Sequence, residues 1–258
     1  MDQFWVGLWE REKEFMHSVK PEFRHGTGVV GVAKLSAQFY CEYKVENEFV
    51  LGEVPTAAKD TGTELHDELM PTEEITPEDF ARLVGAKGPN YAVLGLWGAV
   101  GGLRLVGMPD HMIWSEGRPL WLVELKTTKG DPIPLWNDQE NQARIYGLLL
   151  DCMGFDCSKL RLAVVRLRSG ALDDGEKRDW AAKVSGALMD GTVEELEEAH
   201  QGSMKIHILR HERDLAEAAV EAKRGYWTGE REPTSSRSIG KCRACEYNQV
   251  CVKSLAKP

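Results

Sequence analysis

Asp110, Glu124 and Lys126 are side chains of the types that metal-dependent hydrolysis requires. Hydrolysis of a phosphodiester at neutral pH needs a hard divalent cation such as Mg²⁺ or Mn²⁺, which neutralises developing charge and acidifies a bound water. The two carboxylates would supply anionic oxygens, and the peptide carbonyl of Leu125 would supply another ligand. Lys126 would orient or deprotonate the attacking water, or stabilise the charge of the phosphate; as a base it would need a lowered pKa.

The elements that must position these residues are two strands of a predicted hairpin. Residues 107–128 contain two apolar runs rich in β-branched and aromatic residues, and the polar segment 115–119 separates them. This pattern predicts antiparallel strands joined by a five-residue loop. Symmetric pairing about Gly117 would place Trp114 opposite Leu120.

The same register brings two carboxylates and one ammonium to one small patch. Symmetric pairing places Asp110 opposite Glu124. Because side chains alternate along a strand, Glu124 and Lys126 share this face, while Val123 and Leu125 share the other. The hairpin therefore predicts a site for a metal ion and its bound water.

The competing interpretation is a cross-strand salt bridge on a solvated sheet face. The pattern Glu-x-Lys alone decides nothing, because it also occurs at residues 42–44 and 221–223. Only the copy that begins at Glu124 lies in an apolar strand with Pro109 and Asp110 in register on the preceding strand. This context favours the metal site.

Composition bounds the class of protein without naming a task. The chain has 258 residues, enough for one domain, and a formal net charge of −9. No stretch approaches twenty apolar residues and the N-terminus is not a signal peptide, so we expect a cytoplasmic protein that does not bind membranes. A net negative charge does not favour a nucleic-acid partner. It does not exclude one either, because carboxylates at a metal site add to the negative charge and the local charge of a groove decides whether nucleic acid binds there.

Hydrophobic periodicity predicts the other elements. Helices are expected over residues 3–19, 36–50 with Ser36 as N-cap, 137–153 ended by Gly154, 176–200 and 212–227, with a short helix after Pro77. Strands are expected over residues 160–167 and 205–209, and a glycine-punctuated hairpin over residues 91–106. The sheet should therefore hold several antiparallel strands.

Two further motifs lie on predicted helices. Residues 61–64 form a capping-box pattern that opens a short helix through Leu69, with His66 one turn in. This histidine is either a hydrogen-bonded, half-buried side chain or a metal ligand. Gln142 and Tyr146 are four residues apart and share a helix face. They would either contact a nucleic-acid strand at the rim of the site or serve structurally, with Tyr146 packing and Gln142 bonding a loop.

Three cysteines close together near the C-terminus suggest a metal or a cluster. Cys242, Cys245 and Cys251 have the spacing Cys-x2-Cys-x5-Cys. Three neighbouring thiols are unlike ordinary core residues, and cytosolic disulfides are rare. A metal centre needs a fourth ligand, and zinc with four ligands is physically sound. The candidates for this ligand are a histidine, Cys41, Cys152 and Cys157.

The hairpin motif resembles that of the PD-(D/E)XK nuclease superfamily, and specifically its RecB-like branch. The resemblance rests on Pro109-Asp110 followed by Glu124-Leu125-Lys126, on a Gln-x-x-x-Tyr motif within residues 141–146, and on a Gly-x-x-x-His element at residues 62–66. It covers residues 36 to 251. It implies an α/β fold (α+β, with a mixed sheet and flanking helices), in which the histidine joins the metal ligands.

The cysteine pattern is similar to that of the RecB-like iron–sulfur nucleases. In these proteins an N-terminal cysteine and a C-terminal trio hold a [4Fe–4S] cluster that clasps the two chain ends. The resemblance nominates Cys41 as fourth ligand and leaves Cys152 and Cys157 as core cysteines. The CRISPR-associated RecB-like exonuclease family fits best in size and motif order. Its members often have Pro-Arg after the first cysteine, whereas Glu42 and Tyr43 follow here.

The resemblance implies one nuclease domain over residues 1–258, in which residues 30–50 and 228–258 form the iron–sulfur subdomain. It implies a metal-dependent exonuclease that acts on single-stranded DNA or DNA ends, in CRISPR spacer acquisition and antiviral defence or in DNA repair. CRISPR spacer-integration proteins are the implied partners. The alternatives are a DNA-end-binding module with little or no catalysis in a larger assembly, and a zinc-containing structural protein.

Overall fold

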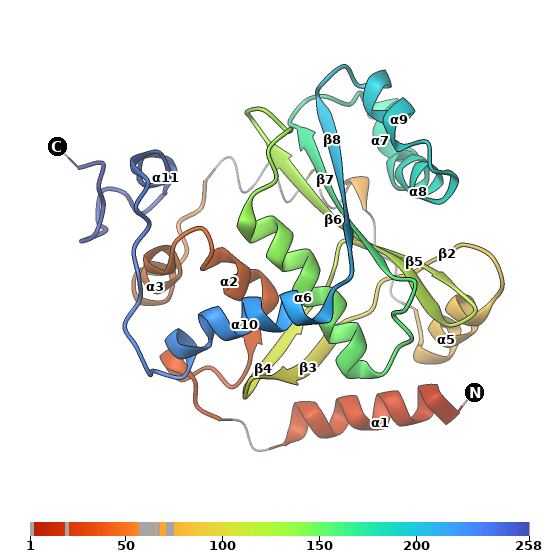
Figure 1. Cartoon of the computed structure of the whole chain (residues 1–258), viewed down its shortest axis with the longest axis horizontal. Coiled ribbons are helices and arrows are strands. Elements are labelled where there is room, and N and C mark those ends of the chain that lie inside the picture. Colours follow the sequence, from red (N-terminus) through yellow and green to blue (C-terminus); the bar gives the residue numbers. More distant parts are fainter. Residues whose placement is uncertain (1–2, 19–20, 57–64, 66–67, 71–74, 258) are drawn as a thin grey trace.

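The computed structural model describes residues 3–18, 21–56, 65, 68–70 and 75–257 and contains two mixed sheets (Figure 1). The five-stranded sheet has the order β2-β5-β6-β7-β8, with bounds Asn90–Tyr91, His111–Ser115, Arg118–Thr128, Arg161–Arg168 and Met204–Arg210. The three-stranded sheet has the order β1-β4-β3, with bounds Val30–Gly31, Leu103–Gly107 and Leu96–Val100. Each sheet contains one parallel pair, β6–β7 and β1–β4.

Helices surround the sheets. In the N-terminal half these are α1 Gln3–His17, the 3-10 turn η1 Arg24–Gly26, α2 Val32–Ala37, α3 Glu42–Leu51 and α5 Pro77–Gly85. The C-terminal half contains α6 Asn137–Met153, α7 Asp174–Arg178, α8 Trp180–Asp190, α9 Val193–Ala199, α10 Arg213–Trp227 and α11 Ile239–Ala244. No helix in the described part of the chain is both long and apolar enough to cross a membrane.

The alternation of side chains along β6 separates two hydrophobic cores. Leu122 packs in the core that includes Leu149 of α6, whereas Val123 packs in the core that includes Trp180 of α8. All four side chains are buried. The five-stranded sheet is therefore covered by α6 and α10 on one face and by the α7–α9 group on the other (Figure 1). Glu124, two residues after Leu122, faces the α6 side.

The turn of the β5–β6 hairpin is shorter than the sequence predicted. Ser115 pairs with Arg118, so only Glu116 and Gly117 form the loop. Both have positive φ, 52° and 76°. Two consecutive residues with positive φ are typical of a type I′ turn, whose twist matches that of the two strands.

A bulge restores the predicted register beside the site. Trp114 pairs with Pro119, and not with Leu120 as predicted, but the register shifts by one residue between Ile113 and Trp114. His111 therefore pairs with Val123, as symmetric pairing about Gly117 requires. The bulge compensates for the short loop, so the part of the hairpin nearest Asp110 has the predicted register.

The predicted helix over residues 36–50 is wrong as a single element, because it is split between α2 and α3. Ser36 lies inside α2, where its hydroxyl donates to the Ala33 carbonyl. The carbonyls of Phe39 and Tyr40 accept hydrogen bonds from Lys241 Nζ at 3.4 and 3.2 Å. These contacts from the far end of the chain stabilise a break, and Cys41 is the extended N-cap residue of α3.

Most other predicted elements are confirmed. α6 has the predicted bounds and ends at Gly154, whose φ of 92° only glycine adopts readily. The predicted hairpin over residues 91–106 is β3–β4, and the acidic segment 176–200 divides into α7, α8 and α9. The predicted capping box at residues 61–64 lies outside the described residues.

Candidate active site

β6 presents Glu124 and Lys126 toward α6. Lys126 Nζ lies 2.6 Å from Glu124 Oε1. The carboxylate side chain is 1% exposed and the lysine side chain 27% exposed. The pair is therefore a partly buried contact at the edge of the core, and not the solvated surface salt bridge of the competing interpretation.

Asp110 precedes β5 and is held against the peptide between Glu124 and Lys126. Its Oδ2 accepts a hydrogen bond of 2.6 Å from the backbone N–H of Leu125. Short hydrogen bonds to a carboxylate are among the stronger ones in proteins. The contact fixes the carboxylate that precedes β5 beside the backbone of β6.

α6 extends this arrangement through Gln142 and Tyr146. Lys126 Nζ donates to Gln142 Oε1 at 3.0 Å, and Gln142 Nε2 donates to the Tyr146 hydroxyl oxygen at 3.3 Å. Because Lys126 can only donate, the amide orientation of Gln142 is defined by the two contacts. We call Asp110, Glu124, Lys126, Gln142 and Tyr146 the carboxylate face.

The charges of the carboxylate face act on Lys126 and Tyr146. Burial lowers the pKa of Lys126, but the neighbouring Glu124 and Asp110 outweigh burial and raise this pKa above its ordinary value. Burial, together with the charges of Glu124 and Asp110, raises the pKa of the Tyr146 hydroxyl. Lys126 is therefore held as an ammonium and Tyr146 as a neutral phenol.

Gly107, the last residue of β4, makes room for Tyr146. A Cβ atom on this glycine would lie 2.7 Å from Tyr146 Cε1 and 3.1 Å from Val32 Cβ. Both neighbours belong to the buried core. The absence of a side chain at Gly107 therefore lets the Tyr146 ring pack where its hydroxyl reaches Gln142.

Sequence reasoning missed Arg166. It pairs with Lys126 across the parallel β6–β7 strands, so the two side chains share a face. Arg166 is 2% exposed, its Nε and Nη1 have no hydrogen-bond partner among the described residues, and its guanidinium lies 5.9 Å from the centre of the Trp136 ring. Burial lowers its pKa, while Asp131 and Asp138 oppose that effect. The available signal was an arginine in the middle of an otherwise apolar strand.

The predicted metal ligand His66 lies outside the described residues. A different histidine, His111, follows Asp110 and is buried. Its Nε2 lies 2.9 Å from Ser185 Oγ. Burial lowers the pKa of His111 to about 4, against the opposing charge of Asp110. His111 is therefore a neutral, hydrogen-bonded histidine.

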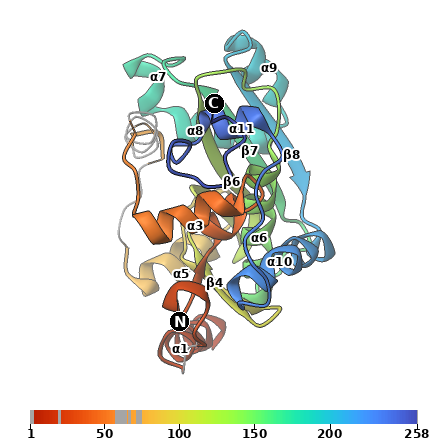
Figure 2. The ribbon, with the colours of Figure 1, turned by 90° about the vertical axis from the view of Figure 1, so that its left-hand side faces the viewer.

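The four nominated cysteines, Cys41, Cys242, Cys245 and Cys251, line one cavity, which we call the cysteine cavity. Its walls come from the start of α3 and from the C-terminal segment, and these two parts of the ribbon lie close to each other (Figure 2). Two of the sulfurs accept backbone N–H groups, Cys41 Sγ from Ser236 at 3.4 Å and Cys242 Sγ from Leu255 at 3.5 Å. The thiols are free of disulfides, and Cys152 and Cys157 lie elsewhere, on and after α6.

Several contacts join the two walls of the cysteine cavity. The Tyr40 hydroxyl donates to the Lys241 carbonyl at 2.8 Å, and the Tyr247 hydroxyl donates to the Gly52 carbonyl at 2.8 Å. Lys44 Nζ lies 3.3 Å from Glu246 Oε2. These contacts position the chain ends through groups other than the thiols.

Glu42, where the sequence departs from the resembled family, bridges the same two segments. Its buried carboxylate accepts hydrogen bonds from Arg231 Nη1 at 2.6 Å and Nη2 at 2.7 Å and from the Thr234 N–H at 2.7 Å, and Lys223 Nζ lies 3.3 Å away. Burial acts to raise the pKa of Glu42, but the hydrogen bonds from Arg231 and Thr234 prevail and lower it to about 2.

Comparisons with known proteins agree with these observations. The model of the PD-(D/E)XK nuclease superfamily matches residues 34–252. Exonuclease V of Danio rerio is 26% identical over 186 residues, which are 60% of this chain and 47% of the relative, so the match spans about half of that protein's length.

Two crystal structures also align with the chain. SSO0001 is 14% identical with a TM-score of 0.46, and the alignment covers 96% of this chain and 95% of that one. An alkaline exonuclease from Laribacter hongkongensis is 15% identical with a TM-score of 0.39, and the alignment covers 78% of this chain and 89% of that one.

Proposed function

This chain belongs to the PD-(D/E)XK nuclease superfamily, and on that premise we propose that it is a divalent-metal-dependent deoxyribonuclease, an exonuclease on single-stranded DNA or DNA ends. The observation that carries the proposal is the hydrogen bond from the Leu125 N–H to Asp110, with Glu124 and Lys126 on either side of that peptide. The exonuclease activity accords with the name of exonuclease V, the similar protein described above.

The oxygen donors of the carboxylate face suit a hard cation. We assign Asp110, Glu124 and the Leu125 carbonyl as ligands of Mg²⁺ or Mn²⁺, with His66 as a further ligand on the strength of its motif. The bound cation would neutralise charge on the phosphate and acidify a water. Carboxylates also raise the affinity of the site for a cation by their charge.

Lys126 acts in its cationic form. Its contacts with Glu124 and Gln142 fix the ammonium group, and the carboxylates favour its charged state. Of the roles considered from sequence, orienting the attacking water and stabilising the phosphate charge therefore suit it better than proton abstraction. Gln142 is a positioning residue for Lys126, and Tyr146 for Gln142.

Arg166 extends the basic part of the site along the same sheet face. Its side chain is 2% exposed, and its two nitrogens without hydrogen-bond partners among the described residues are buried, so it acts through its charge and not by contact with DNA. We assign it the role of adding positive potential beside Lys126.

The cysteine cavity would hold a [4Fe–4S] cluster with Cys41, Cys242, Cys245 and Cys251 as ligands. Four thiols from both chain ends line it, and backbone N–H groups approach two of the sulfurs, a feature that stabilises thiolates in such clusters. The cluster would be structural, because hydrolysis involves no electron transfer. Residues 30–50 and 228–258 would then form an iron–sulfur subdomain of a single domain over residues 1–258.

The biological setting is proposed from the resemblance alone. A nuclease that trims DNA ends fits CRISPR spacer acquisition in the cytoplasm, with spacer-integration proteins as partners, and it also fits DNA repair. Co-purification of the tagged chain with those proteins from cells that carry a CRISPR array would support the first setting. If the tagged chain purifies from those cells without the spacer-integration proteins, the result would point to DNA repair.

The test of the catalytic proposal is DNA cleavage by anaerobically purified protein. End-labelled single- and double-stranded DNA is incubated with Mn²⁺, Mg²⁺ or EDTA. We expect progressive loss of nucleotides from DNA ends with either cation and none with EDTA. Tight binding to DNA ends without cleavage under any metal condition would instead identify an end-binding module.

A further inference from the structure

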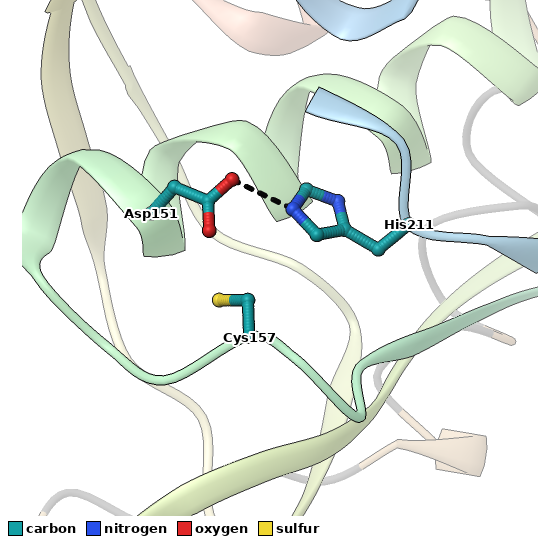
Figure 3. A group of neighbouring side chains, drawn as sticks. All are labelled: Asp151, Cys157 and His211. Carbon is teal, nitrogen blue, oxygen red and sulfur yellow. Dashed lines mark hydrogen bonds and ion pairs between the residues drawn. The ribbon is translucent and has the colours of Figure 1, made fainter. Parts of the chain in front are cut away.

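Three potential metal ligands meet at a place remote from the carboxylate face. Asp151 lies near the end of α6, Cys157 lies in the connection to β7, and His211 follows β8 (Figure 3). A carboxylate oxygen, the Cys157 sulfur and an imidazole nitrogen all lie within 4.8 Å of one another. Gln142 and Asp151 are nine residues apart on α6, which corresponds to about 13 Å along the helix.

The three side chains are mostly buried, and each keeps a small exposed fraction. His211 and Asp151 side chains are 8% and 17% exposed, and Cys157 is 8% exposed. His211 Nε2 lies 2.7 Å from Asp151 Oδ2. Such a position excludes most of the solvent.

Gly147 orients the imidazole. This glycine lies one turn before Asp151 on α6, and a Cβ atom on it would lie 2.7 Å from His211 Nδ1. The ring therefore packs against the helix through the Nδ1 edge and presents Nε2 to Asp151 and Cys157 (Figure 3). The fold thus selects which ring nitrogen faces the other two side chains.

The order of the three groups argues against a nucleophilic cysteine. In such a site the imidazole contacts the thiol and the carboxylate orients the imidazole from behind. Here the carboxylate of Asp151 bonds Nε2 and Gly147 packs against Nδ1, so neither ring nitrogen is left for the Cys157 thiol. Burial and the nearby Asp151 raise the pKa of that thiol, which is the opposite of activation.

We propose that Asp151, Cys157 and His211 bind one zinc ion. One sulfur, one nitrogen and one oxygen form a donor set that suits Zn²⁺, whereas Mg²⁺ requires oxygen donors. On binding, the Cys157 thiol releases its proton to solvent, the Nε2 proton of His211 moves through solvent to Nδ1, and the Nε2–Asp151 hydrogen bond is replaced by two bonds to zinc. A water molecule completes four-coordination.

The zinc site would be a structural cross-link. It would join the end of α6 to the segment after β8, positions separated by 60 residues. A metal bound only by the folded state stabilises that state in proportion to the logarithm of its concentration. Because α6 also carries Gln142 and Tyr146, the site would hold the helix that supports the carboxylate face.

The test compares wild-type protein with His211→Gln, which retains an amide able to bond Asp151 but is a poor zinc ligand. Anaerobically purified protein is treated with EDTA, equilibrated with zinc and desalted, and zinc per chain is measured. We expect one more zinc in wild type than in His211→Gln. Wild-type Tm should rise by about 5–10 °C at a zinc concentration near one hundred times Kd.

Controls separate this site from the cysteine cavity and the carboxylate face. Cys152→Ser changes a cysteine on α6 that is not one of the three proposed zinc ligands, and this variant should retain the extra zinc. Asp151→Asn serves as the second variant if His211→Gln fails to fold. Equal zinc content in folded wild type and variant, or a wild-type Tm that does not respond to zinc, would overturn the proposal while leaving the nuclease assignment untouched.

Discussion

The carboxylate face and the cysteine cavity are assembled in opposite ways. Asp110 directly precedes β5, and Glu124 and Lys126 lie in β6, so one hairpin and the hydrogen bond from the Leu125 N–H bring them together. The walls of the cysteine cavity come from opposite ends of the chain, and a typical contact between them, Tyr40 to Lys241, spans 201 residues. The first site depends on local pairing and the second on the completed fold.

Because of this difference, substitutions at the two sites should have different effects. Changes in the carboxylate face should remove chemistry and leave the fold intact, because the hairpin is built by backbone pairing and buried apolar side chains. Changes in the cysteine cavity should destabilise the fold, since they release a long loop from its constraint. Measuring activity and stability on the same variants therefore tests the comparison.

The largest effect is expected for Asp110→Ala, Glu124→Ala and Lys126→Ala. Each should lower divalent-dependent DNA cleavage by at least about a hundredfold, because residues that act as a unit lose activity together. All three variants should remain folded with any iron content near wild type, although Lys126→Ala should lower Tm because it removes the ammonium group beside the buried Glu124 carboxylate. Glu221→Ala is the matched control, since it changes an exposed copy of the Glu-x-Lys pattern. Near-normal cleavage by folded Lys126→Ala would break the assignment.

The next effect concerns the cysteine cavity. Anaerobic wild-type protein should be brown with about four irons per chain, and Cys41→Ser should lose this colour and several kcal/mol of unfolding free energy. Cys152→Ser and Cys157→Ser should keep the colour. Stoichiometric zinc without iron in anaerobic preparations would replace the cluster by a zinc site, and an unchanged cluster in Cys41→Ser would remove Cys41 as ligand.

The buried carboxylate of Glu42 should make the stability of the fold beside the cysteine cavity sensitive to acid. Its pKa falls from 4.5 to about 2 on folding. A lowered carboxyl pKa contributes stability that is fully present above pH 4.5 and is lost as pH falls toward 2. The whole contribution is about 3 kcal/mol. The test is urea unfolding at pH 5.5 and at pH 3, in a Cys41→Ser background that lacks the cluster. Between these pH values, protein with Glu42 should lose about 2 kcal/mol more unfolding free energy than the Glu42→Gln variant. Equal losses would contradict this role.

The smallest effect is expected for Gly107→Ala. The added Cβ would approach Tyr146 and Val32, so the Tyr146 ring must shift and its hydroxyl contact with Gln142 should weaken. We expect about tenfold slower cleavage and a destabilisation of roughly 1–3 kcal/mol. Gly117→Ala, at the distant turn of the same hairpin, is the control: its positive φ costs stability but does not reach the site. Unchanged cleavage by Gly107→Ala would remove Tyr146 from the positioning chain.

Sequence patterns predicted the part of the hairpin near the site, because its register follows from the alternation of side chains along the strands and from the position of the turn. They misplaced Trp114 opposite Leu120, since neither the type I′ turn nor the bulge has a strong local signature in Ser-Glu-Gly-Arg-Pro. They predicted α6 to the residue because Gly154 ends it.

Other features depend on contacts that no local pattern contains. The break between α2 and α3 depends on Lys241 binding the carbonyls of Phe39 and Tyr40. Arg166 was missed because its neighbour Lys126 is brought beside it only by the parallel β6–β7 pairing. Nonlocal pairing likewise joins Asp151, Cys157 and His211.

The most direct test of the central claim is to locate the catalytic cation. Crystals soaked in manganese chloride would reveal it through anomalous scattering. We predict a Mn²⁺ peak bound by the carboxylates of Asp110 and Glu124 and the Leu125 carbonyl at about 2.1 Å, the usual distance for a small hard cation. His66 turned away from this peak would remove only its own assignment. Manganese bound elsewhere, in crystals of protein that cleaves DNA with manganese, would contradict the account.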